Sequence, residues 1–134
     1  MSAVSYKGRC FCGTVKFTVA GSEKYACFCH CESCRRAAGG TSVPWATFAR
    51  QDFVVTDGEM AAHCSAPGVT RGLCTVCGTS LTYENENRPG QIDVTLTSFE
   101  DPSAITPRSH IWVEDKLPWV AIGDSLPQYD KNAG

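Results

Sequence analysis

Cysteine spacing constrains this chain more than any other feature of its sequence. Nine cysteines occur in 134 residues, and seven of them fall into three short clusters: Cys10-Phe-Cys12-Gly13, Cys29-His-Cys31-Glu-Ser-Cys34 and Cys74-Thr-Val-Cys77-Gly78. An odd number of cysteines cannot pair completely in internal disulfides, and the first residues lack the apolar stretch of a secretory signal peptide. The sequence therefore predicts a reduced, cytoplasmic protein whose thiols have another use.

Aliphatic residues are scarce in this chain. Leu, Ile and Val together number 20, which is few for the core of a domain of this length. We expect a single domain over residues 1–134, stabilised partly by bound metal. The net charge of −2, with Arg35-Arg36 as the only adjacent basic pair, argues against nucleic acid as a partner. No apolar run approaches the ~20 residues of a membrane-spanning helix, so no membrane partner is expected.

Alternation of apolar and polar residues predicts a mainly β protein. The pattern is clearest at 15–19 and 92–96, and further strands are expected at 25–31, 42–48, 53–56, 61–65, 79–83 and 110–113. A short helix is predicted at 32–38, ended by Gly39-Gly40, and a second helical turn after Asp101-Pro102. Residues 130–134 are expected to form a frayed tail.

The first and third cysteine clusters have the form of two halves of one metal site. Short spacing puts two sulfurs on one side of a turn, and the glycine after each pair permits the positive φ that such a turn requires. Four thiolates close a tetrahedral zinc site of the structural type. We therefore predict a structural zinc, against the alternative of buried free thiols, held by Cys10, Cys12, Cys74 and Cys77.

The middle cluster has a different geometry. Cys29 and Cys31 share one face of a predicted strand, and Cys34 lies one turn into the predicted helix, so three sulfurs converge. Three protein ligands leave the fourth position of a zinc ion open to water, a thiolate or a carbonyl oxygen. The spacing therefore predicts a catalytic zinc. His30, between two of the ligands, has the opposite strand parity and is expected to point away from the metal.

Four motifs in order along the chain point to a known family. They are Gly8-x-Cys10-x-Cys12-Gly13, Cys29-His30-Cys31-x-x-Cys34-Arg35-Arg36, Arg71-Gly72-x-Cys74-x-x-Cys77-Gly78, and His110-Ile111-Trp112 with Asp115-Lys116-x-Pro118-Trp119. Together they resemble the glutathione-dependent formaldehyde-activating enzyme family, which includes centromere protein V, over about residues 5–127. The resemblance implies a β-tent fold of antiparallel sheets around a structural zinc, as in methionine sulfoxide reductase B and a Rab-binding exchange factor.

The resemblance also implies an activity and two zinc ions per chain. The structural zinc is held by the two outer cysteine pairs, and the catalytic zinc by Cys29, Cys31 and Cys34. The implied activity is that of a carbon–sulfur lyase similar to S-(hydroxymethyl)glutathione synthase, which joins glutathione to formaldehyde. The expected partners are therefore a small thiol, glutathione or similar, and a small aldehyde.

Residues near the last catalytic thiol are candidates for binding the substrate. Arg35 and Arg36 directly follow Cys34, and one of them is expected to stabilise thiolate charge or to bind a substrate carboxylate. Arg71 and Lys116 are weaker candidates for the same role. His110 belongs to the C-terminal motif of the family and is expected to wall the pocket.

Large aromatic residues are expected mainly in the core. Trp112 and Trp119 can wall the pocket, but plain core packing is the expectation for both. Trp45 and Phe48 follow the predicted helix and are expected to pack near the second metal.

Two cysteines depart from the commoner family pattern and leave alternatives open. Cys27 has the same strand parity as Cys29, and Cys64 can approach from another strand, so either can close the second zinc site. Each is more simply an inert buried thiol. A closed site would favour a non-catalytic zinc domain that binds a protein partner. An exposed Cys27 or Cys64 near another free sulfur would favour a thiol redox enzyme.

Overall fold

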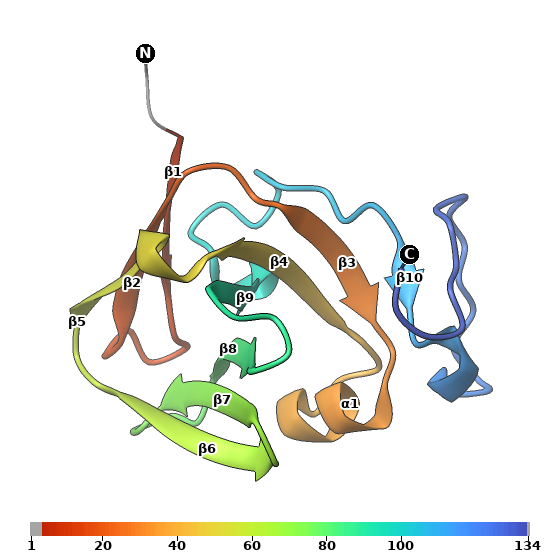
Figure 1. Cartoon of the computed structure of the whole chain (residues 1–134), viewed down its shortest axis with the longest axis horizontal. Helices are drawn as coiled ribbons and strands as arrows, with labels where there is room; N and C mark the ends of the chain where they lie inside the picture. The colour runs from red at the N-terminus through yellow and green to blue at the C-terminus, as the bar shows by residue number, and fades with distance from the viewer. Residues whose placement is uncertain (1–3, 134) are drawn as a thin grey trace.

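The computed structural model describes residues 4–133, which form ten strands and one α-helix (Figure 1). The helix α1 spans Glu32–Ala38, and short 3₁₀ turns lie at Arg50–Asp52, Leu96–Ser98 and Val113–Asp115. The strands are β1 (Ser5–Arg9), β2 (Lys16–Ala20), β3 (Tyr25–Cys29), β4 (Val43–Ala49), β5 (Phe53–Asp57), β6 (Met60–Ala66), β7 (Val69–Cys74), β8 (Ser80–Asn85), β9 (Gln91–Thr95) and β10 (His110–Ile111). The expectation of a mainly β protein with one short helix is confirmed.

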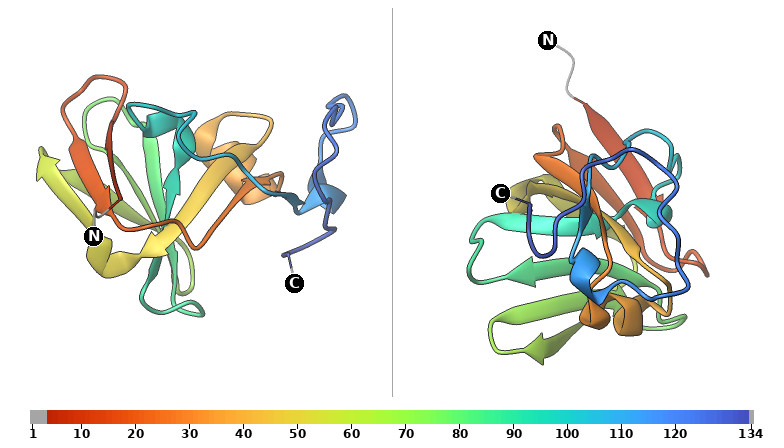
Figure 2. Two further views of the ribbon diagram at one scale, coloured as in Figure 1. Left: turned by 90° about the horizontal axis from the view of Figure 1, so that it is seen from above. Right: turned by 90° about the vertical axis from the view of Figure 1, so that its right-hand side faces the viewer.

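The strands form two sheets. The smaller has the order β1-β2-β5, and the larger has the order β10-β3-β4-β9-β8-β7-β6. Strand pairing is antiparallel throughout these sheets except between β10 and β3, which are parallel. Figure 2 shows the small sheet on one side of the molecule and the C-terminal segment, in blue, on the other.

The main core lies between the two sheets and is rich in aromatic residues. Phe17 of β2 packs against Phe53 and Phe99, with ring centroids 5.2 and 6.0 Å apart. Phe48 of β4 joins this cluster, 6.2 Å from Phe99. Phe17 and Phe48 are both almost fully buried. Large rings thus supply much of the packing that the few aliphatic residues cannot.

Most predicted strands are confirmed, with shifted ends, but two strands have no predicted counterpart. The sequence gives weak alternation in β1 and β7, which contain Gly8 and Gly72. The strand predicted at 110–113 stops early because Trp112 adopts a left-handed conformation, with φ 55°. A single hydrogen-bonded turn forms at the predicted place after Asp101-Pro102, where the Ala104 N–H donates to the Asp101 carbonyl at 3.1 Å, and no helix continues from it.

The helix α1 occupies the predicted residues, because both of its ends have local capping. Cys31 is the N-cap, and its Sγ accepts a hydrogen bond from the Cys34 backbone N–H at 3.3 Å. Gly39 has φ 71° and donates its backbone N–H to the Arg35 carbonyl. This is the left-handed cap for which glycine is preferred.

The C-terminal segment is docked rather than frayed. The His110 N–H donates to the Pro127 carbonyl, and the Tyr129 N–H donates back to the His110 carbonyl. The Trp112 indole Nε1 donates to Asn132 Oδ1 at 3.1 Å. The prediction of a frayed tail is therefore wrong as far as residue 133, because β10 offers unpaired backbone groups to this segment, while Gly134 lies outside the described residues.

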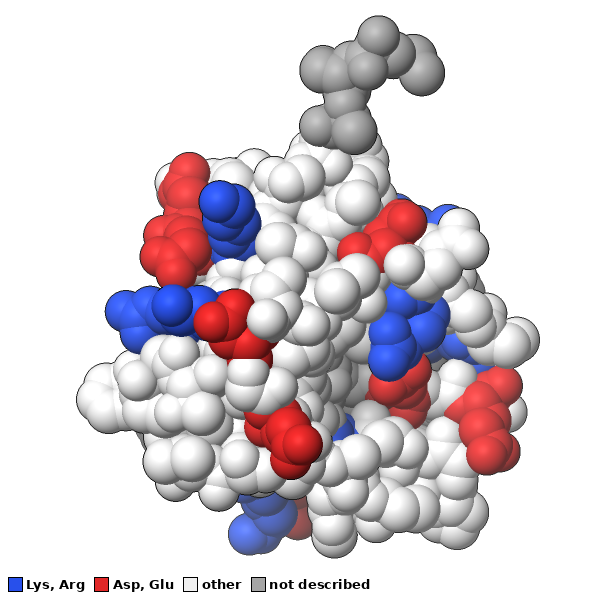
Figure 3. All heavy atoms as spheres, turned by 90° about the vertical axis from the view of Figure 1, so that its left-hand side faces the viewer, with Lys and Arg blue, Asp and Glu red and all other residues white. Residues whose placement is uncertain are grey.

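Charged side chains of both signs are mixed on the surface. Figure 3 shows Lys and Arg interleaved with Asp and Glu on the face drawn. Several of these charges are paired, as in Arg50–Glu84 at 2.9 Å. Within residues 4–133, no helix has the length and apolar character needed to cross a bilayer.

Gly8 is predicted to be essential to the packing of the small sheet. It faces Phe17 across the β1–β2 pair, and a methyl group on Gly8 would overlap the buried Phe17 ring. Gly8→Ala should therefore lower the free energy of unfolding by about 1–3 kcal/mol, measured by urea denaturation. Lys7→Ala, at the exposed neighbouring position, is the control and should change it by under about 0.5 kcal/mol. Equal effects of the two changes would contradict this account.

Candidate functional site

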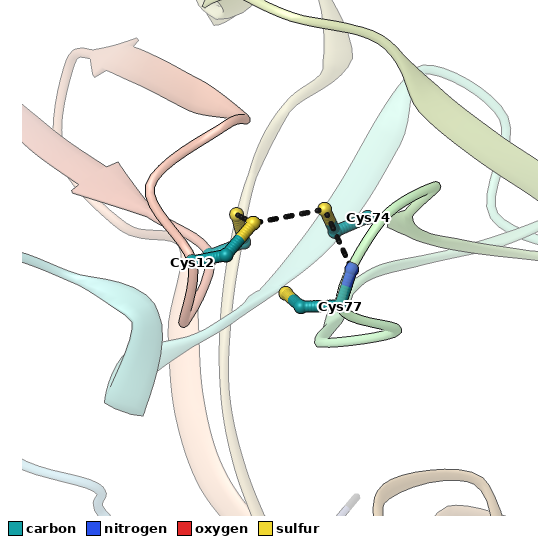
Figure 4. A group of neighbouring side chains, drawn as sticks. Cys12, Cys74 and Cys77 are labelled. Carbon is teal, nitrogen blue, oxygen red and sulfur yellow. Dashed lines mark hydrogen bonds between the residues drawn. The ribbon is translucent and has the colours of Figure 1, made fainter.

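Two groups of cysteine thiols come together in the fold. The four-cysteine group consists of Cys10, Cys12, Cys74 and Cys77, whose sulfurs all lie within 4.8 Å of one another. The Sγ of Cys12 lies 3.6 Å from that of Cys10 and 3.8 Å from that of Cys74. Figure 4 shows the side chains converging from two separate loops. These loops connect β1 to β2 and β7 to β8, so the group joins the small sheet to the large one.

Local backbone geometry prepares the four-cysteine group to be anionic. Gly13 and Gly78 have φ of 80° and 76°, as the turn argument predicted. The N–H groups of Val15 and Val76 point at sulfurs, at 3.3 Å from the Sγ of Cys10 and Cys74. The Thr79 hydroxyl, 3.0 Å from Cys77 Sγ, lowers the pKa of Cys77 to about 5. Such contacts stabilise thiolates, which are the form that binds metals.

The three-cysteine group consists of Cys29, Cys31 and Cys34, again with all sulfurs within 4.8 Å of one another. Cys29 ends β3, Cys31 is the N-cap of α1, and Cys34 lies in the first turn of that helix. Cys29 and Cys34 are each 5% exposed, so two of the three thiols are almost entirely out of water. Hydrogen bonds from the Cys29 and Cys34 thiols lower the pKa of Cys31, so this group also holds negative charge at neutral pH.

Arg71 supplies a positive charge beside the three-cysteine group. Its Nη1 and Nη2 both lie 3.9 Å from Cys34 Sγ, and its Nε donates to Ser65 Oγ at 3.3 Å. The guanidinium lies over the Tyr83 ring, 4.9 Å from the centroid, and the residue is 8% exposed. In residues 4–133 it forms no ion pair with a carboxylate. The Cys31 thiolate, whose pKa is lowered by the Cys29 and Cys34 thiols and also by Arg71, is therefore the negative group that balances this buried cation.

A cavity of about 880 Å³ opens at the three-cysteine group. Its floor is the polar face of the large sheet, where Asp93 accepts hydrogen bonds from Thr47 at 2.6 Å and from Arg88 at 2.6 Å. Arg71, Tyr83 and Trp112 contribute to its walls. This size is in the range of small-molecule sites and far exceeds the volume of a one-carbon aldehyde.

A family model matches residues 5–115 and carries the description glutathione-dependent formaldehyde-activating enzyme. The chain belongs to this family. It is also similar to the crystal structure of a Rhodobacter sphaeroides protein, a Northeast Structural Genomics target, with a TM-score of 0.60 and 25% identity over 76% of this chain and 92% of that chain. A comparison with curated proteins found no match. The resemblance inferred from the sequence is confirmed, and both cysteine groups lie inside the matched region.

Arg35, Arg36 and His110 do not line the cavity of this formaldehyde-activating family member. Arg36 is exposed and pairs with Glu32 at 2.7 Å, and Arg35 Nε donates to the His30 carbonyl at 3.3 Å. His110 is buried on the other side of β3, stacked on Phe28 at 4.9 Å. Their assignment to substrate binding stays a prediction.

The predicted packing of large aromatic residues needs two corrections. Trp45 packs with Cys29 and Cys34 as expected, but Phe48 lies in the main core. Residues three apart in a strand face opposite sides of the sheet, which separates the two. Trp119 is 72% exposed, so its predicted core position is wrong, whereas the half-buried Trp112 lines the cavity.

Neither of the two additional cysteines of this family member joins the three-cysteine group. Cys27 lines the cavity and is buried, and burial together with nearby Asp93 raises the pKa of its thiol to about 12. Cys64 is exposed on β6, where its thiol donates to the Ala66 carbonyl at 3.1 Å. Among the described residues, no fourth Cys, His, Asp or Glu offers a ligand atom within the same 4.8 Å.

The two additional thiols are predicted to differ strongly in reactivity. At neutral pH, iodoacetamide should modify Cys64 in the folded protein and leave Cys27 unmodified, because Cys27 is buried and protonated. Peptide mass spectrometry after timed quenching measures both positions. Denaturation in urea is the control and should expose both thiols equally. Rapid labelling of Cys27 in the folded chain would contradict the burial argument and revive a redox role for it.

Proposed function

We propose that this protein is a zinc-dependent carbon–sulfur lyase that joins a small thiol, glutathione or a similar compound, to formaldehyde or another small aldehyde. The observation that carries this proposal is the three-cysteine group at the end of a substrate-sized cavity, separate from a complete four-cysteine group. Family membership supplies the substrate class. The free thiols suit a reducing compartment, and we propose the cytoplasm.

The donor atoms fit zinc at both groups. Zinc binds thiolates at about 2.3 Å, which places the sulfurs of a tetrahedral site about 3.8 Å apart. The Cys10–Cys12 and Cys12–Cys74 sulfur distances of 3.6 and 3.8 Å match this spacing. With four soft ligands, the first site is closed and serves the fold. With three, the second site keeps a ligand position for substrate, so we propose two zinc ions per chain.

The reaction requires a nucleophilic sulfur next to a small carbonyl compound. The thiol sulfur adds to the carbonyl carbon to form the C–S bond, and the thiol proton ends on the new hydroxyl oxygen. Zinc bound by Cys29, Cys31 and Cys34 would supply Lewis-acid chemistry that favours the thiolate form of the substrate or polarises the carbonyl oxygen. The cavity walls would hold the two reactants together and limit access of water.

Arg71 is the residue to which we assign charge balance in this site. Three thiolates and one divalent cation carry one net negative charge, which would repel an incoming thiolate. The guanidinium beside Cys34 Sγ offsets that charge, and its burial over Tyr83 strengthens the effect. Arg71 therefore takes the role that the sequence assigned first to Arg35 or Arg36.

The two rival functions have less support. A non-catalytic zinc domain that binds a protein partner requires a closed second site without a cavity, but the three-cysteine group opens into one. Thiol redox catalysis requires an exposed or activated Cys27, or a free sulfur beside Cys64. Cys27 is buried with a raised pKa, and Cys64 contacts a carbonyl oxygen.

Substitution of Cys34 tests the two zinc sites and the activity together. Wild type should hold about two zinc ions per chain, and Cys34→Ser should hold one and remain folded, measured by elemental analysis and circular dichroism. The variant should lose catalysis of adduct formation between ¹³C-formaldehyde and glutathione, followed by NMR. Cys64→Ser, the matched control, should keep both metal and activity. A single zinc that survives Cys34→Ser, or retained catalysis, would overturn the proposal.

Replacement of Arg71 tests the charge-balance role. Arg71→Met keeps an unbranched side chain but removes the charge, so it should lower kcat/KM for the thiol by about tenfold or more. Arg71→Lys should retain part of the activity, because lysine keeps the positive charge but lacks the two guanidinium nitrogens that lie near Cys34 Sγ. Arg50→Met, at an exposed arginine that does not line the cavity, is the control. An Arg71→Met enzyme as active as this control would show that the cation is dispensable.

A further inference from the structure

A chain of three hydrogen-bonded side chains lies on the side of β3 away from the cavity. His110 Nε2 lies 2.9 Å from one carboxylate oxygen of Asp124 and 3.1 Å from the other, and His110 Nδ1 lies 2.9 Å from His30 Nε2. Since the carboxylate can only accept, His110 donates from Nε2, and its Nδ1 shares a second hydrogen bond with His30 Nε2. The three side chains therefore form one connected chain from His30 through His110 to Asp124.

The two imidazoles are deeply buried. His30 is 2% exposed and His110 is 5% exposed. His30 Nδ1 has no hydrogen-bond partner in the described part of the chain, so the ring is held through Nε2 alone. Buried polar groups without partners are costly, so loss of the Asp124 acceptor would weaken the whole chain.

His30 is also the residue between two of the three clustered thiols. Its backbone N–H donates to the Ile111 carbonyl at 3.0 Å, and its carbonyl accepts from Arg35 Nε at 3.3 Å. The contact of its ring with His110 is a third attachment. Because neighbouring side chains in an extended chain alternate in direction, fixing His30 on one side fixes Cys29 and Cys31 on the other.

Asp124 belongs to a segment that has its own attachment to the site. The segment lies beyond residues 5–115, the part matched by the family model. Within the segment, the Leu126 N–H donates to Oδ1 of Asp124 at 3.0 Å and so orients the Asp124 carboxylate. The right-hand view of Figure 2 shows the segment as a blue loop on the near side, and its last described residues, Asn132 and Ala133, line the cavity.

We propose that Asp124 is a positioning residue, which acts through His110 and His30 to hold Cys29 and Cys31 in the geometry of the second metal site. The proposal rests on the proposed function only in taking the three-cysteine group as a metal site. It assigns a role in the site to the C-terminal segment, which contributes no sulfur. It also gives His110 a role on the far side of β3, distinct from contact with substrate.

The test compares zinc release from Asp124→Ala with that from Asp130→Ala. Asp130 is an exposed aspartate of the same segment whose side chain forms no hydrogen bond within residues 4–133. With a chromophoric chelator in excess, Asp124→Ala should release one zinc about tenfold faster or more, while the other zinc leaves at the wild-type rate. Asp124→Asn keeps an acceptor of similar size and should restore much of the slow release. In cobalt-substituted protein, Asp124→Ala alone should alter the sulfur-to-metal absorption.

Two results would overturn this proposal. One is release of zinc from Asp124→Ala at the rate of the Asp130→Ala control. The other is equal acceleration of both zinc ions, which would indicate general destabilisation. If Asp124→Ala does not fold, Asp124→Leu, which fills a similar space without an acceptor, is compared with Asp130→Leu by the same two criteria.

A wild type with a single zinc would contradict the proposed function and remove the metal from this inference, leaving the claim that Asp124 positions Cys29 and Cys31 through His110 and His30. The inference is then decided by hydrogen exchange of the His30 amide, which Asp124→Ala accelerates only if the chain of side chains holds this end of β3. Unchanged exchange would overturn it.

Discussion

The fold depends on the meeting of four cysteine sulfurs between two loops. One loop belongs to the small sheet and the other to the large sheet, so the group links two layers that otherwise share a core of aromatic and aliphatic residues. Few aliphatic residues are available, so packing alone would offset too little of the conformational entropy that the chain loses on folding. A link of this kind offsets part of the remainder. Backbone N–H groups directed at the sulfurs of Cys10 and Cys74 favour the thiolate form at both positions.

The three-cysteine group uses the start of a helix as part of its chemistry. Cys31 both caps α1 and contributes a sulfur, so the same atom fixes the helix and the site. Arg71, from β7, reaches the group from across the cavity. The C-terminal segment stabilises the strand end from the opposite side through His110. Three distant parts of the chain thus position sulfurs that lie within six residues of one another.

Local patterns in the sequence determined most of the secondary structure and both cysteine groups. Alternation identifies strands such as β2 and β9, and Gly39 marks the end of α1, because these signals act within a few residues. The spacing of the cysteines and the glycines after them fix which sulfurs can share a turn. The sequence did not predict β1 and β7, because a glycine weakens the alternation in each strand. Contacts across the sheet explain these glycines, since Gly8 lies against Phe17 and Gly72 against Thr82.

Only the tertiary structure decided which other side chains surround the site. Arg35 and Arg36 are adjacent to Cys34 in sequence, yet Arg71, 37 positions away, is the arginine that contacts its sulfur. The link from Asp124 through His110 to His30 likewise joins residues far apart along the chain. Sequence determines short-range geometry because few torsions separate the residues. Long-range contacts depend on how the sheets pack, and no local pattern encodes that packing.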